Sequence, residues 1–210
     1  MKQHSLGYEN FNPSFVMTEN FFSEDPHPHV DEWEQMQAIQ HDEVNLAVLR
    51  RRLPRVRDSI REILDTCSRG VQIAVENSDD LDLVPAYFDE ELNLQSQDAF
   101  SFYKDIRLLL EQFFVLSNAK QVGVRLEPVS TDNCRLFHVD FVGLRLVSTY
   151  YGPGTEWIRN EHVNRIGLGK DDNSLILSPG AIIQRLNPGW VGLMKGERFF
   201  GNLGNGLAGS

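Results

Sequence analysis

Cysteine and long apolar segments are scarce in this sequence, and each shortage excludes a class of protein. The 210 residues include two cysteines, Cys67 and Cys134, which are too few for a disulfide framework and suit a reducing compartment. No window approaches the roughly 18 apolar residues typical of a membrane-spanning helix, and the first residues lack the apolar stretch of a secretory signal. We therefore expect a cytoplasmic protein that does not contact a membrane.

The motifs of several common enzyme classes are also absent. There is no Ser-His-Asp order, no glycine-rich phosphate loop and no Cys-x-x-Cys pair, so hydrolase, nucleotide-binding and thiol-redox functions have no support. Positive charge is scarce too, because the formal net charge is −10. Residues 1–43 hold nine acidic residues and one lysine, so this segment carries −8 and the rest only −2. This balance argues against nucleic acid, which binds clustered Lys and Arg.

What is present fits one globular domain with an extension. Hydrophobic residues make up 41% of the chain and charged residues 24%, which is ordinary for a globular protein. We expect an acidic irregular arm over residues 1–42, with one short helix near 31–39, and a single α+β domain over 43–210. The first part of this domain, 43–120, is predicted to be helical and the second, 121–210, to be β-structure.

The spacing of apolar residues places the expected elements. Helical spacing over 43–66, interrupted at Pro54, predicts a kinked helix or two short helices. The same spacing over 96–118, with Ser96 as N-cap, predicts a further helix. From residue 121 the period changes to 2. The expected strands are 71–75, 122–127, the two strands of a central hairpin within 134–157, 174–177, 181–186 and 190–195, with none after 201. Helices before many short strands predict an α+β fold, with N-terminal helices packed on a jelly-roll-like sheet, a double-stranded β-helix. Since about six strands follow residue 121 and a jelly roll needs about eight, we expect this sheet to be incomplete at the C-terminus.

Two polar clusters precede the predicted sheet. The run from Pro26 to Asp31 contains a His-x-Asp pair, but its two prolines leave it without a defined strand face, so we interpret it as a solvated linker. The arginines within residues 50–57 form either an anion site or, as we favour, a solvated helix face that pairs with the acidic arm.

A second His-x-Asp pair lies in the predicted hairpin. Side chains alternate along a strand, so Cys134, His138 and Asp140 share one face. With about 3.3 Å of rise per residue, the last two lie about 6.6 Å apart at Cα, close enough to converge on one ion. The pair is therefore half of a metal site, or two-thirds of a 2-His-1-carboxylate triad. The alternative is a hydrogen-bonded couple in which the two side chains brace each other.

The hairpin carries a family resemblance. Its segment Cys-Arg-Leu-Phe-His-Val-Asp over 134–140, the Arg-Leu pair that follows, and Thr-Tyr-Tyr-Gly-Pro-Gly-Thr-Glu-Trp over 149–157 resemble the domain of unknown function 1826 family of bacterial proteins. The resemblance runs from about residue 44 to the C-terminus. It implies no established activity.

A broader similarity connects the same strands with the iron- and 2-oxoglutarate-dependent dioxygenases of the prolyl-hydroxylase type. It implies that His138 and Asp140 are the first two iron ligands. Those enzymes also have a second histidine late in the barrel, and beyond it a basic residue that clamps 2-oxoglutarate. Past Asp140 this sequence has only His162, which is early for that role. Either the sequence is truncated, or the site is closed differently, for example by Cys134, whose thiolate would favour zinc over an oxygenase iron.

Other residues of the hairpin are candidates for the same pocket. Arg145, Thr149 and Tyr151 share one face of the second strand and are predicted to bind a cofactor, with cross-strand packing as the alternative. Glu156 is either a structural turn residue or part of the site.

Two functions follow from these residues. The first is a non-haem Fe(II) oxygenase-like enzyme that uses 2-oxoglutarate and acts on an unidentified small molecule or protein. The second is a non-catalytic metal-binding (zinc-type) or metal-homeostasis protein with Cys134, His138 and Asp140 as ligands. In both cases an open sheet edge would favour a homo-oligomer.

Overall fold

The computed structural model describes residues 25–66, 70–76, 78–129 and 136–210. Its α-helices are α1 (Arg57–Thr66), α2 (Leu83–Leu92) and α3 (Ala99–Ser117). Its 3-10 helices are η1 (Trp33–Gln40), η2 (Ser78–Asp82), η3 (Asn160–His162), η4 (Arg165–Gly167) and η5 (Asn173–Leu175). Its strands are β1 (His29–Val30), β2 (Leu46–Leu49), β3 (Val71–Val75), β4 (Val122–Leu126), β5 (His138–Val139), β6 (Leu144–Ser148), β7 (Glu156–Ile158), β8 (Ile183–Arg185), β9 (Val191–Lys195) and β10 (Ala208–Gly209). This mixture confirms the α+β class.

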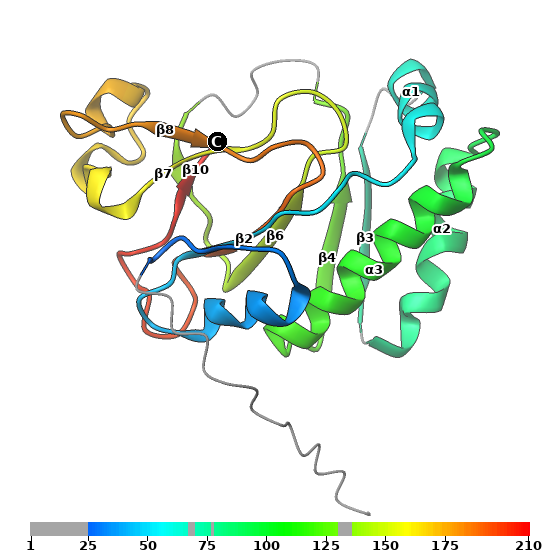
Figure 1. The fold of residues 1–210 in the computed structure, drawn as a ribbon, viewed down its shortest axis with the longest axis horizontal. Coiled ribbons are helices and arrows are strands. Elements are labelled where there is room, and N and C mark those ends of the chain that lie inside the picture. The colour runs from blue at the N-terminus through cyan, green and yellow to red at the C-terminus, as the bar shows by residue number, and fades with distance from the viewer. Residues whose placement is uncertain (1–24, 67–69, 77, 130–135) are drawn as a thin grey trace, which may run out of the picture.

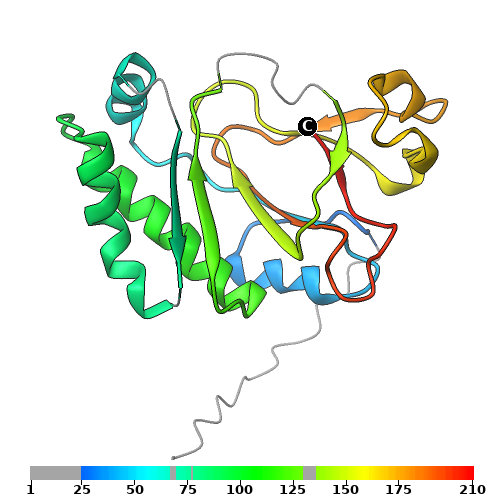
Figure 2. The ribbon, with the colours of Figure 1, turned by 180° about the vertical axis from the view of Figure 1, so that it is seen from behind.

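The strands form three sheets. Sheet A has the order β1-β2-β9-β6, sheet C the order β5-β10-β7-β8, and sheet B pairs β3 with β4. Neighbours within each sheet are antiparallel except β1 and β2, which are parallel. Helices α2 and α3 lie at the sheet B end of the molecule, and the excursion from η3 to η5 lies at the opposite end (Figure 1, Figure 2).

Helix α3 joins two parts of the core, because its apolar face is broad enough to meet two sheets. Its residues Phe102, Ile106, Leu110 and Phe114 pack with sheet B, α1 and α2. Other apolar residues of α3 pack with β2, β9 and η1 on sheet A. The helix ends at Asn118 in the left-handed conformation, as C-terminal caps commonly do.

Sheets A and C face each other across a third group of apolar residues. Leu46 and Val48 of β2 and Met194 of β9 pack there with Trp157 of β7. The opposite face of sheet C is covered by the excursion between residues 160 and 177, through contacts such as Ile158 with Ile176. Sheet C is therefore packed on both faces, against sheet A on one side and against residues 160–177 on the other.

Two helix predictions needed correction. Residues 46–49 form β2, with all four side chains buried, and not the first part of a helix. A short run buried on both faces is continuously apolar, and such a run does not distinguish a strand from a buried helix. Helix α3 begins at Ala99 with Asp98 at its N-cap, so the expected cap at Ser96 was wrong. Helix α2 lies in a segment for which we expected no element.

Four predictions about strands and linkers were also wrong. The expected central hairpin does not form, because β5 belongs to sheet C and β6 to sheet A. Residues 174–177 contain a 3-10 helix and not a strand. Residues 201–210 include β10, which lies between β5 and β7. The supposed linker at 26–31 contributes β1 to sheet A, and its His27 is only 1% exposed.

Candidate functional site

His138 and Arg145, two of the predicted site residues, lie on the facing sides of sheets C and A. His138 is paired with Gly209, which is paired in turn with Trp157, so all three share one face of sheet C. Trp157 packs against sheet A, so this face is the inner one. By the same argument Arg145 of β6, which is paired with Met194, lies on the inner face of sheet A. The site therefore lies where the edge strands β5 and β6 approach each other.

Three titratable side chains, His138, Asp140 and Arg145, meet at this edge. The Nε2 atom of His138 is 3.6 Å from Oδ1 of Asp140, and Nη1 of Arg145 donates a hydrogen bond of 2.7 Å to Oδ2. The other ring nitrogen of His138, Nδ1, is 3.1 Å from the carbonyl oxygen of Leu136. A carbonyl can only accept, so Nδ1 carries the proton in this contact. In the neutral ring the lone pair is then on Nε2, which faces the Asp140 carboxylate.

Each charge favours the ionised form of its neighbour. The Asp140 carboxylate raises the pKa of His138 above its ordinary value, although partial burial of the ring opposes this. Contact with His138, and then with Arg145, lowers the pKa of Asp140 to about 2. The His138 side chain is 43% exposed and that of Asp140 28%, so the pair is at the rim of the inter-sheet space and open to solvent.

The other candidates are distributed unevenly around this pair. Of the predicted cofactor residues, Arg145 contacts Asp140 of the pair. The backbone carbonyl of Thr149 accepts a hydrogen bond from the backbone N–H of Gly189. Tyr151 is 72% exposed. Cys134 lies outside the described residues. Glu156 pairs with Arg185 on β8.

A third metal ligand is not found beside the pair in the described part of the chain. Across residues 25–66, 70–76, 78–129 and 136–210, no three His, Cys, Asp or Glu side chains come together as a metal site. His162 belongs to η3, in the excursion that covers the outer face of sheet C, whereas His138 is on the inner face.

The sequence profile of a family described as "Protein of unknown function (DUF1826)" matches residues 30–208. This chain belongs to the DUF1826 family. The match confirms the family resemblance seen in the hairpin segments and extends it toward the N-terminus, to include Val30 of β1 and all of η1. Comparisons with curated proteins and with solved structures gave no match, so the weaker similarity to dioxygenases has no support from them. No helix in the described residues of this DUF1826 protein is long and apolar enough to cross a membrane.

A buried polar cluster in the DUF1826 protein was missed by sequence reasoning. Asp105 of α3 accepts hydrogen bonds from Nη1 and Nη2 of Arg51, at 2.5 and 2.9 Å, and from the Tyr150 hydroxyl, at 2.6 Å. Burial, and then the Asp105 charge, raises the pKa of Tyr150 well above its usual range. This cluster ties the end of β6 and the segment after β2 to α3. Its one signal in the sequence is Arg51, which we assigned to a solvated helix face.

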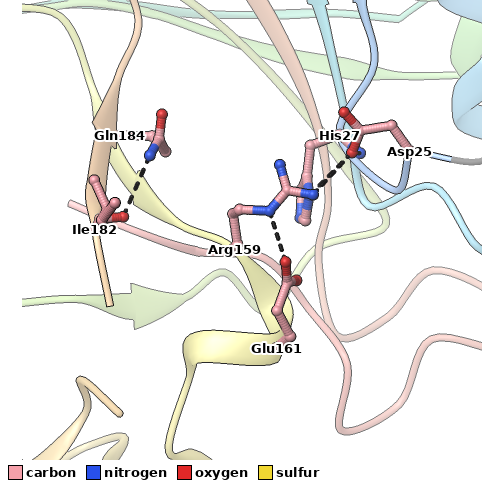
Figure 3. Close-up of polar contacts among 6 residues, drawn as sticks. All are labelled: Asp25, His27, Arg159, Glu161, Ile182 and Gln184. Atoms are coloured by element: carbon pink, nitrogen blue, oxygen red, sulfur yellow. Dashed lines mark hydrogen bonds and ion pairs between the residues drawn. The ribbon is translucent and has the colours of Figure 1, made fainter. Parts of the chain in front are cut away.

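A second cluster was missed at the edge of the sheets near β1. There Arg159 bridges two carboxylates, with Nη2 at 3.0 Å from Oδ1 of Asp25 and Nε at 2.6 Å from Oε1 of Glu161, beside the buried ring of His27 (Figure 3). Sequence reasoning placed His27 in a linker because the prolines on both sides of it obscured the strand.

Proposed function

We propose that this DUF1826 protein binds a divalent metal ion, Fe(II) or Zn, through His138 and Asp140. The observation that supports this most is the distance of 3.6 Å between Nε2 and Oδ1. It is longer than a direct hydrogen bond, and two donors that are each about 2.1 Å from one ion lie within about 4.2 Å of each other. The contact of Nδ1 with the Leu136 carbonyl also supports the proposal, since metal-binding histidines usually donate their second N–H to such a group.

We further propose that sheets A and C are the two halves of a jelly-roll-like double-stranded β-helix. From β5 to β10 the chain passes repeatedly between the two sheets, and each has four strands. Jelly rolls place ligands between such sheets. The rim position of His138 and Asp140 is consistent with a site at the mouth of this unit.

An oxygenase-like reaction with 2-oxoglutarate is the activity we propose to test at this site. Arg145 supplies a positive charge next to the metal pair, where an anionic oxo-acid would bind; Thr149 and Tyr151 would line the cofactor side. A zinc-type site with Cys134 as third ligand is the alternative, because an even sequence spacing to His138 would bring both side chains to one face if the segment between them were extended. For both versions we propose a cytoplasmic location, because a chain with only two cysteines suits a reducing compartment.

Metal content measured by elemental analysis after loading with Fe(II) or Zn²⁺ tests the proposal. We expect about one ion per chain in the wild type, and loss of the ion in both His138→Gln and Asp140→Asn. The matched control is His29→Gln, which changes the other His-x-Asp pair, whose Asp31 is held by Arg50. Full metal retention by His138→Gln or Asp140→Asn would contradict the proposal, as would equal loss in the His29→Gln control.

Two further measurements separate the versions. Loss of zinc in Cys134→Ser would support the zinc-type site, whereas unchanged metal content would leave Cys134 without a ligand role. Release of succinate from 2-oxoglutarate in the presence of Fe(II) would support the oxygenase version. Its absence in a chain that holds iron would leave only metal binding.

A further inference from the structure

The ring of His27 is buried between sheets A and C, and among the described residues neither of its nitrogens has a hydrogen-bond partner. Its side chain has no exposed surface, and its ring centroid is 4.9 Å from that of Trp157. A neutral imidazole always carries one N–H donor, and leaving a buried donor unpaired is unfavourable. The ring is therefore held by packing, not by polar contacts.

This ring anchors an edge strand. Three backbone carbonyls of this segment accept hydrogen bonds from backbone N–H groups in or next to β2. Pro26 accepts from Asn45 at 2.9 Å, Pro28 from Val48 at 2.9 Å, and Val30 from Arg50 at 2.8 Å. These contacts attach residues 26–30 to β2, at the edge of sheet A. Because His27 packs on Trp157 of sheet C, the same segment closes the gap between the two sheets on this side.

The charges around His27 do not compensate a positive ring. Asp25 is nearest, with Oδ1 at 3.8 Å from Nδ1, but the same oxygen accepts a hydrogen bond from Arg159. Arg159, which lies between β7 and η3, and Glu161 of η3 act on the ring, as does His29 of β1 two residues further along the chain. Burial, and then the Arg159 guanidinium, lowers the pKa of His27 to about 4, so the ring is neutral while it is buried.

We propose that His27 is a proton-sensitive latch, whose neutral ring keeps residues 26–30 between the sheets and whose protonation releases them. Release would free β1 from β2 and expose the inner face at Trp157, which lies in the same cross-strand row as Gly209 and His138. The latch therefore controls access to the inter-sheet space from the side opposite the β5–β6 edge. It does not depend on metal binding.

Hydrogen exchange of the full chain, corrected for the intrinsic rate at each pH, tests the latch. The amides to follow are those of Val48 and Arg50, which donate hydrogen bonds to the carbonyls of Pro28 and Val30 within residues 26–30. With a pKa of about 4 when buried and 6.5 when released, protonation of His27 alone should raise the open fraction about 20-fold between pH 7 and pH 5. The β3–β4 ladder should keep its protection, because this opening is local.

A matched pair of variants identifies the group responsible. His27→Phe keeps an aromatic ring against Trp157 but cannot bind a proton there, so most of the pH response of its exchange should be lost. The part that remains comes from His29, whose pKa is also lowered by burial in the same segment. His29→Gln keeps His27 and should keep most of the wild-type response. Three outcomes would overturn the proposal: unchanged wild-type protection at pH 5, the same loss of protection in His27→Phe, or simultaneous loss in the β3–β4 ladder.

Discussion

Replacing Asp105 by Asn should be among the most destabilising single changes in this protein. The carboxylate holds a side chain of Arg51 that is only 14% exposed, and is itself only 6% exposed. Asn keeps nearly the same size but removes the charge, so the guanidinium stays buried without a counter-ion. Breaking a buried ion pair from one side in this way costs about 3–5 kcal/mol. Because whole domains are stable by about 5–15 kcal/mol, we expect a large part of the free energy of unfolding to be lost.

The same helix provides the control. Glu111 accepts a hydrogen bond of 3.1 Å from Nη1 of Arg107, but these side chains are 47% and 37% exposed. An exposed pair one helical turn apart contributes about 0.3–0.5 kcal/mol, so Glu111→Gln should be nearly neutral. Tyr150→Phe removes only one hydrogen bond to the Asp105 carboxylate and should fall between the two, at about 1.5–3 kcal/mol.

Urea unfolding of the wild type and the three variants, followed by circular dichroism, measures these differences. If Asp105→Asn lost less than about 1 kcal/mol, the value expected for exposed pairs, the cluster would not be the buried anchor that its geometry indicates. Equal losses in Asp105→Asn and Glu111→Gln would show that burial does not distinguish the two pairs.

Three further predictions concern the rim site and the packing of β10. NMR titration should give His138 a pKa above 6.5. Its attraction to Asp140 therefore stabilises the fold at lower pH, and this stabilisation is lost as the pH rises through the raised pKa. In Asp140→Asn the pKa of His138 should fall, and an unchanged value would contradict the role of the Asp140 carboxylate. Gly209→His would place an imidazole opposite His138 on the same face, so calorimetric affinity for Zn²⁺ should rise by about tenfold or more, equivalent to about 1.4 kcal/mol; no increase would argue against a shared site. Gly206→Ala should lower thermal stability by about 1–3 kcal/mol, because its Cβ would be 2.1 Å from a methyl carbon of Val139 in β5. Gly143→Ala should be nearly neutral, because among the described residues its Cβ would meet no atom within 4 Å apart from those of its chain neighbours.

Some elements were predictable because one local pattern determined them. Helix α3 and strands β3 and β4 have side-chain periods that agree with how they are buried, so their positions followed from the sequence. Strand β2 failed the same test, since it is buried on both faces and its apolar run has no period that distinguishes strand from helix. The missed hairpin pairing has another cause. Which strand pairs with β5 depends on β10, which is far along the chain and only two residues long.

The candidate site divides in the same way. That His138 and Asp140 come close together was determined by the sequence, because alternation along one short extended segment brings their side chains to one side. Their exposure at a rim, and the contact of Asp140 with Arg145, depend on how β5 and β6 approach from different sheets.

Only the tertiary structure decided the fate of the buried polar residues. Arg51 meets Asp105, and His27 meets Trp157, across long separations in sequence. A charged or titratable side chain looks the same in sequence whether it is solvated or buried. Burial is tolerated only where distant segments bring a counter-charge, as for Arg51, or close packing around an uncharged ring, as for His27. Local periodicity carries no information about either, so the sequence alone placed both residues in solvent.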